Sequence, residues 1–280
     1  MRDNASRADN QQEMLKSNFY FSGLMAGEMS CSIIKRKNHN PRGHYFAIDL
    51  TVTNADKKLL TEVNRVVMHD RGLITPVKRA YNLSARGKDK VRIVLNFLGR
   101  YPILTGDLAI NRIIVLRTAL SYLDNHRGHV FQDRKTEEMG KLRRKLRELK
   151  IEGKVDELFD LYPSDHESLG YFLAGVIDGE GSFGFKTSGF TKEPFFVVAM
   201  KDKKIIESLR KFVDYGNVRL RKDGVYSLEI NRRNILKNVC NTFLNLYPLR
   251  HERQRTRLHT LQQLLNDYTP KSLNSNFQRT

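Results

Sequence analysis

Two short segments with glycines four residues apart constrain the fold of this chain more than any other feature. The clearer segment, LAGVIDGEG, has Gly175 and Gly179, and a weaker copy near the N-terminus, FSGLMAGEM, has Gly23 and Gly27. Residues i and i+4 of a helix lie on one face, and small residues there let two backbones come unusually close. We therefore predict that two helices dock on each other through these glycines.

Each segment carries an acidic residue directly after its second glycine, namely Glu28 and Glu180. Both carboxylates would stand at helix C-termini, where the helix dipole disfavours negative charge. Docking the helices would also bring two like charges together, which repel. A cation between the two carboxylates would relieve both effects, and oxygen ligands favour a hard ion such as Mg²⁺ over zinc.

The two segments resemble the motif of the LAGLIDADG homing endonucleases. The stretch 173–181 matches the motif almost position for position, whereas 21–29 keeps its glycines and final acid but has Ala26 in place of the first acid. In that family the last acid binds the metal and the first acid is more often structural. The resemblance implies four metal ligands: the carboxylates of Glu28 and Glu180 and the backbone carbonyls of Gly27 and Gly179.

Composition is consistent with a protein that binds nucleic acid. The chain has 280 residues, enough for two modest domains, and a formal net charge of +18 with a pI near 9.9. A surplus that large points to a polyanionic partner. The apolar runs are far shorter than a membrane span, so no membrane partner is expected.

The two cysteines, Cys31 and Cys240, are too few for a disulfide framework or a cysteine zinc site. They indicate a reducing compartment, either an organelle matrix or a microbial cytoplasm.

The second half of the sequence repeats landmark residues of the first half at regular spacing. Asp56 and Asp202 are 146 residues apart, as are Pro102 and Pro248, whereas Gly23 and Gly175 are 152 apart. The difference places extra residues in the first hairpin of the first half. Matching anchors of this kind indicate an internal duplication. We predict an α+β fold of two pseudo-symmetric αββαββα halves, each with a four-stranded antiparallel sheet, together forming a DNA-binding saddle.

The expected organisation is a disordered tail at 1–13, a first half at 14–124, a basic helical linker at 125–164, a second half at 165–268 and a tail at 269–280. Ser17 is the expected N-cap of the first helix, and the linker helix has an apolar stripe surrounded by basic residues. Whether its basic face is merely solvated or meets DNA phosphates is open.

Strand alternation predicts which side chains face DNA. In the first half, counting in twos from Glu28 gives Ser32, Ile34 and Arg36. In the second half the count gives Gly184 and Lys186, and Arg219 and Arg221 flank a core-facing Leu220. Arginine can read guanine in the major groove, and basic side chains elsewhere meet phosphates.

The resemblance also implies accessory catalytic groups. A polar residue at the end of the second strand orders water in the family, and this position is Asn54 in the first half but Met200 in the second. A base near the start of the last helix is expected beside the scissile phosphate, and Arg250 and Arg253 fit it. The matching stretch of the first half, 102–107, has no base.

The leading interpretation is a site-specific, double-strand DNA endonuclease that uses Mg²⁺ or Mn²⁺ and leaves staggered ends. Ca²⁺ is expected to support binding without cleavage, and the protein should act as a monomer on a long, asymmetric duplex target. Two alternatives use the same scaffold: an intron maturase that binds RNA, and a catalytically inactive DNA-binding protein.

Overall fold

A computed structural model describes residues 15–37, 44–125, 132–153, 155, 157–188 and 191–267. The tails predicted at 1–13 and 269–280 and the turn predicted at 38–43 lie outside the described residues.

The first half contains one four-stranded antiparallel sheet with the strand order β1-β2-β4-β3. Its elements are α2 (Phe19–Glu28), β1 (Met29–Lys37), β2 (His44–Asn54), α3 (Lys57–Met68), β3 (Leu73–Val77), β4 (Ala80–Arg86), α4 (Lys88–Arg100) and α5 (Asp107–Asn125). Helix α6 (Gln132–Ile151) follows and joins the halves.

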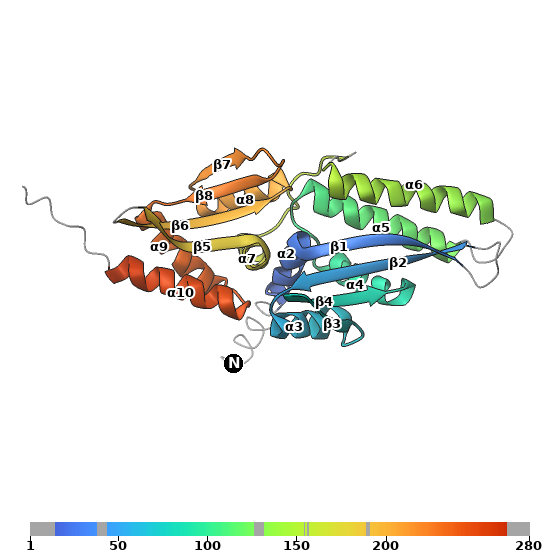
Figure 1. The fold of residues 1–280 in the computed structure, drawn as a ribbon, viewed down its shortest axis with the longest axis horizontal. Helices are drawn as coiled ribbons and strands as arrows, with labels where there is room; N and C mark the ends of the chain where they lie inside the picture. Colours follow the sequence, from blue (N-terminus) through green and yellow to red (C-terminus); the bar gives the residue numbers. More distant parts are fainter. Residues whose placement is uncertain are drawn as a thin grey trace, which may run out of the picture.

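The second half repeats this plan, with the strand order β5-β6-β8-β7. Its elements are α7 (His166–Glu180), β5 (Gly181–Ser188), β6 (Thr191–Met200), α8 (Lys203–Val213), β7 (Asn217–Leu220), β8 (Tyr226–Ile230), α9 (Arg233–Asn241), the π-helical turn η1 (Thr242–Leu246) and α10 (Glu252–Asp267). The predicted α+β fold with two repeated halves is confirmed. Figure 1 shows the two sheets side by side, with α2 and α7 between them.

Each sheet packs one face against helices and leaves the other face uncovered by them. In β2 the alternate residues Phe46, Ile48, Leu50 and Val52 are all buried, and α4 and α5 pack against this strand. In the second half, Phe196, Val198 and Leu228 are buried in the same way. We call the opposite side of each sheet its outward face.

Two local predictions were wrong. The residue that precedes α2 is Asn18 rather than Ser17, and Asn18 makes no side-chain capping bond. Leu220 is 62% exposed instead of buried. Its neighbour Val218 does pack against the core, so the alternation holds, but Leu220 is the last residue of a short edge strand and lies where the core has ended.

Helices α2 and α7 touch backbone to backbone. A Cβ atom placed on Gly23 would lie 1.8 Å from the Phe172 carbonyl oxygen, and one on Gly175 would lie 1.9 Å from the Tyr20 carbonyl oxygen. Both distances are far inside van der Waals contact, so only glycine fits at either position. The predicted docking of the two helices through these glycines is therefore present.

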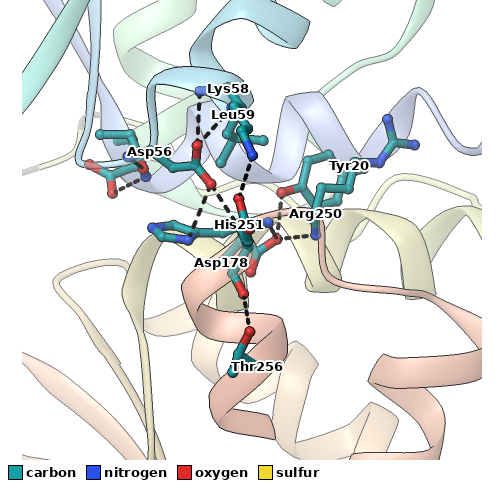
Figure 2. Close-up of polar contacts among 11 residues, drawn as sticks. Tyr20, Asp56, Lys58, Leu59, Asp178, Arg250, His251 and Thr256 are labelled. Carbon is teal, nitrogen blue, oxygen red and sulfur yellow. Dashed lines mark hydrogen bonds and ion pairs between the residues drawn. The ribbon is translucent and has the colours of Figure 1, made fainter. Parts of the chain in front are cut away.

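The halves also cap each other's last helices. Asp202 of the second half accepts hydrogen bonds from the backbone N–H groups of Asp107 and Ala109, both 3.0 Å, at the start of α5. Its repeat mate Asp56 accepts from the N–H of Glu252 at 3.0 Å, at the start of α10 (Figure 2). Each carboxylate satisfies N–H groups that a helix leaves unpaired. These crossed caps fix the last helix of each half relative to the other half.

We expect Gly23→Ala and Gly175→Ala each to lower the free energy of unfolding by about 3 kcal/mol or more, because the methyl group would meet backbone that can move only if the helices separate. Gly140→Ala in α6 is the matched control. Its Cβ would meet nothing nearer than 3.9 Å, so it should stabilise by about 0.5–1 kcal/mol. Urea denaturation measures all three. Equal behaviour of Gly140→Ala and Gly23→Ala would refute the backbone contact.

Candidate active site

The two acids at the ends of α2 and α7 cross over each other's helices. A Cβ atom on Gly27 would lie 3.0 Å from Cγ of Glu180, and one on Gly179 would lie 3.0 Å from Cγ of Glu28. Each acidic side chain therefore lies against the second glycine of the opposite motif. The same glycines that bring the helices together make room for a pair of carboxylates, one from each half.

Burial and mutual repulsion disfavour charge at this pair. Burial, and to a smaller extent the charge of Glu180, raise the pKa of Glu28 from an ordinary 4.5 to about 8. The hydrogen bond from Asn54 acts in the opposite direction. Burial also raises the pKa of Glu180, and the guanidinium of Arg112 opposes that rise. Ionisation of both acids is therefore disfavoured unless positive charge is supplied beside them.

Asn54, the polar residue expected at the end of the second strand, lies beside the first acid. It is buried at the end of β2, and its Nδ2 donates a hydrogen bond to Glu28 Oε1 at 3.3 Å. Its own Oδ1 accepts from the Asp56 N–H at 2.8 Å, which fixes the orientation of the amide. The repeat mate Met200 is buried and cannot make such bonds.

A cavity of about 290 Å³ lies beside the second acid. Glu180 and Gly27 line it together with Arg112 of α5, Lys150 of α6 and Met200 at the end of β6. Ala199, from the outward face of the second sheet, also lines it, so the cavity reaches that face.

Arg112 is a site residue that the sequence analysis missed. Its Nη1 donates to the Met29 carbonyl at 3.0 Å and its Nη2 to the Ala26 carbonyl at 3.4 Å, so it holds the chain on both sides of Glu28. In the second half Gln254 of α10 plays the corresponding part, donating to the Gly181 carbonyl at 2.7 Å. The sequence signal that could have identified Arg112 is its place as a single charged residue in the otherwise largely apolar stretch AINRIIVL.

Asp178, the first acid of the second motif, is a structural residue. It is 1% exposed, and its Oδ2 accepts hydrogen bonds from the Tyr20 hydroxyl at 2.5 Å and from the N–H groups of Arg250 and His251 at 2.6 and 2.9 Å (Figure 2). These contacts join α2 of the first half to the segment that leads into α10.

Arg250 is engaged in a contact between the halves. Its Nη1 pairs with Glu62 at 2.7 Å, and its guanidinium lies 4.6 Å from the ring centre of Tyr20 and 4.8 Å from that of Phe21. The catalytic role predicted for Arg250 stays a prediction, and it would require these contacts to break. Arg253 is exposed in the first turn of α10.

The side chains predicted to face DNA differ in their surroundings. Ser32, Arg36, Lys186 and Arg219 are exposed at alternate positions of their strands, and Ile34 is partly buried. Arg36 lies 3.4 Å from Asp49, and Arg219 lies 3.9 Å from Glu229. Lys186 stands over the Phe195 ring at 4.9 Å.

Arg221 does not belong to the alternating set, because β7 ends at Leu220. Arg221 lies in the turn that follows and pairs with Asp223 at 3.0 Å.

Within the described segments, no group of three or more His, Cys, Asp or Glu side chains could hold a metal ion. A metal at the acid pair would therefore have two carboxylates, with other ligands from carbonyls, water or substrate. Neither cysteine is in a disulfide, and burial raises the pKa of both thiols. None of the described helices has the length and apolar character that a bilayer crossing requires.

The raised pKa of Glu28 predicts how the stability of the protein depends on pH in the absence of divalent ions. Its pKa is about 8 in the folded protein and about 4.5 when unfolded, so between these values the folded state holds more protons. Stability should therefore fall as pH rises from about 4.5 to about 8. Glu28→Gln should remove this loss, so its advantage over the wild type should grow with pH. Urea denaturation at pH 5, 6.5 and 8 measures it, and a pH-independent difference would contradict it.

The comparisons with known proteins agree with this geometry. The family model described as LAGLIDADG endonuclease matches residues 173–262. A search of curated proteins by sequence finds no match. Three solved structures share the fold: I-GzeII in complex with its DNA target, I-SmaMI bound to uncleaved DNA in the presence of calcium ions, and I-AabMI bound to uncleaved DNA.

These similarities extend over most of the chain. I-GzeII is 14% identical with a TM-score of 0.75, covering 89% of each chain. I-SmaMI is 18% identical with a TM-score of 0.72, covering 92% of this chain and 95% of that one. I-AabMI is 15% identical with a TM-score of 0.70, covering 89% and 90%. The resemblance is confirmed: residues 173–262 match the LAGLIDADG endonuclease family, and the chain as a whole has the fold of the LAGLIDADG homing endonucleases.

Proposed function

We propose that this protein is a site-specific DNA endonuclease that cuts both strands of a duplex with the help of a divalent metal and leaves staggered ends. The observation that carries the proposal is the crossed pair of Glu28 and Glu180. One acid comes from each half, at the end of α2 and of α7, and these two helices lie between the two sheets (Figure 1). That position serves one cut in each strand.

The nature of the partner is supported independently. The solved structures that share this fold include I-GzeII and I-SmaMI, each bound to its DNA target. The net charge of +18 also suits a polyanionic partner. We propose that Ser32, Ile34, Arg36, Lys186, Arg219 and Arg221 contact the duplex. Because the two halves, at 14–124 and 165–268, supply two different half-sites, the expected target is long and asymmetric, and one chain should suffice to bind it.

The acid pair fits a hard divalent ion. Its donors would be the carboxylates of Glu28 and Glu180 and the carbonyls of Gly27 and Gly179, all of them oxygen, and Mg²⁺ commonly binds through one or two carboxylates together with phosphates and water. Burial and the neighbouring Glu180 raise the pKa of Glu28, and a bound cation would oppose both effects. When bound, Mg²⁺ or Mn²⁺ would polarise the phosphate and activate water, and Ca²⁺ would support binding without cleavage.

The protein groups around the acids have distinct proposed roles. Asn54 would orient the water that attacks one strand, since its amide is already held beside Glu28. Arg112 holds the backbone that carries Glu28, and its charge opposes the rise in the pKa of Glu180. Arg253, exposed in the first turn of α10, would meet a phosphate, and Arg250 would do so only after leaving Glu62.

Glu28→Gln and Glu180→Gln should each abolish double-strand cleavage, by at least about a hundredfold, and leave duplex affinity nearly unchanged. Glutamine keeps the shape of glutamate and removes the charge that holds the metal. The target can be selected from a randomised duplex library bound in Ca²⁺ and then cleaved in Mg²⁺. Glu207→Gln is the matched control, because that acid is paired with Lys203 on the surface of α8. Linear product from Glu180→Gln at the wild-type rate would refute the proposal.

Asn54→Ala should slow the cutting of one strand more than the other, because Met200 supplies no equivalent group in the second half. A supercoiled plasmid carrying the target should then accumulate as the nicked form before it becomes linear. Asn245→Ala, at an exposed asparagine of η1, is the control. Equal slowing of both strands would contradict the assignment of Asn54 to one half.

A further inference from the structure

We infer that helix α6 is a phosphate-binding rail for duplex DNA, formed by Arg143, Arg147 and Lys150; the inference rests on the proposed function. We refer to these three residues as the α6 rail. It would extend the DNA-binding surface beyond the two sheets, along the edge of the first one.

The helix is held firmly against the first half. Its side chains Met139, Leu146 and Leu149 are buried, and it packs along α5 and the edge strand β1 (Figure 1). Its last turn is fixed by the second half, where Lys201 Nζ donates to the carbonyls of Lys150 at 3.4 Å and Ile151 at 3.1 Å. Side chains on its free surface are thus presented by a rigid element.

The chain that follows α6 is pinned to the first half as well. Asn111 Nδ2 donates to the Glu157 carbonyl at 2.9 Å, the Phe159 N–H donates to Asp107 Oδ1 at 2.6 Å, and the Tyr162 N–H donates to the Leu104 carbonyl at 2.8 Å. The connection between the halves is therefore an ordered part of the fold over these residues.

The basic side chains of α6 differ in their ion pairing from one side of the helix to the other. At 3.6 residues per turn, Arg143 lies about 20° and Arg147 about 60° from Lys150 around the helix. All three are exposed, and none has an ion pair within the described part of the chain. On the opposite side, Lys141 pairs with Glu137 at 2.9 Å and Glu138 at 2.8 Å. The flank from Lys150 through Arg143 to Arg147 is thus basic and uncompensated, whereas the side around Lys141 carries paired charges.

The uncompensated flank reaches the acid pair at one end, through Lys150. Lys150 lines the cavity that also contains Glu180, Gly27 and Arg112. Ala199 of the outward face of the second sheet lines the same cavity. The α6 rail therefore begins at the candidate active site and continues along the flank of the first sheet. Arg143 and Lys150 are about 10 Å apart along the helix, which is about three base pairs of duplex.

Duplex DNA of arbitrary sequence tests the rail without knowledge of the target. The variant Arg143→Gln/Arg147→Gln is compared with Lys141→Gln/Lys145→Gln, which removes the same charge from the opposite side of the same helix. Lys150 is left intact because it lines the cavity at the acids. Affinity for a 30-bp duplex, measured by fluorescence anisotropy in EDTA over a range of KCl concentrations, gives the slope of log K against log salt.

The rail predicts that Arg143→Gln/Arg147→Gln lowers the steepness of this slope by nearly two and weakens binding about tenfold or more at low salt. The control should change the slope by much less, and both variants should melt at the wild-type temperature. Equal effects of the two variants would mean that only net charge matters and would overturn the rail. Loss of single-stranded RNA binding with unchanged duplex binding would also overturn it. A wild-type protein that binds no duplex would instead refute the proposed function.

Discussion

The backbone contact between α2 and α7 is the interaction on which the rest of this structure depends. Gly23 and Gly175 bring the two helices closer than any side chain would allow. Because each helix runs directly into the first strand of its sheet, this contact also sets where the two sheets lie. The acids that end the helices are consequently forced together. The structural contact and the candidate chemistry thus have one cause.

Around this common frame the two halves have diverged. Asp56 and Asp202 are repeat mates with the same crossed capping role, so the duplication is preserved where it supports the fold. At the acids it is not preserved. The position of Asn54 in the first half is taken by Met200 in the second. The backbone carbonyl of the residue after each acid accepts a hydrogen bond from Arg112 in the first half and from Gln254 in the second. Two halves that build the same scaffold therefore give the two acids different surroundings.

Local patterns in the sequence were enough to predict the two glycine-bearing helices and the alternation of the strands, because these depend on neighbours close in the chain. The constant spacing of matching residues was enough to predict the repeat, and the shared glycine pattern to predict that its two helices meet. The crossed caps of Asp56 and Asp202 could not be predicted, since they depend on which helix end from the other half lies nearby. Arg250 shows the same limit. Its position after Pro248 suggested a phosphate contact, but its partners Glu62, Tyr20 and Phe21 all come from the other half. Leu220 shows that strand alternation does not reveal where a core ends.

The most direct test of the account is the titration of the Glu28 carboxylate, followed by carbon NMR in metal-free protein and assigned by comparison with Glu28→Gln. The account predicts a midpoint near pH 8, because burial and the charge of Glu180 both oppose ionisation. In Glu180→Gln the midpoint should move down part of the way toward 4.5, since the burial remains. A midpoint near 4.5 in the wild type that does not respond to Glu180→Gln would show that the two helices do not bring their acids together.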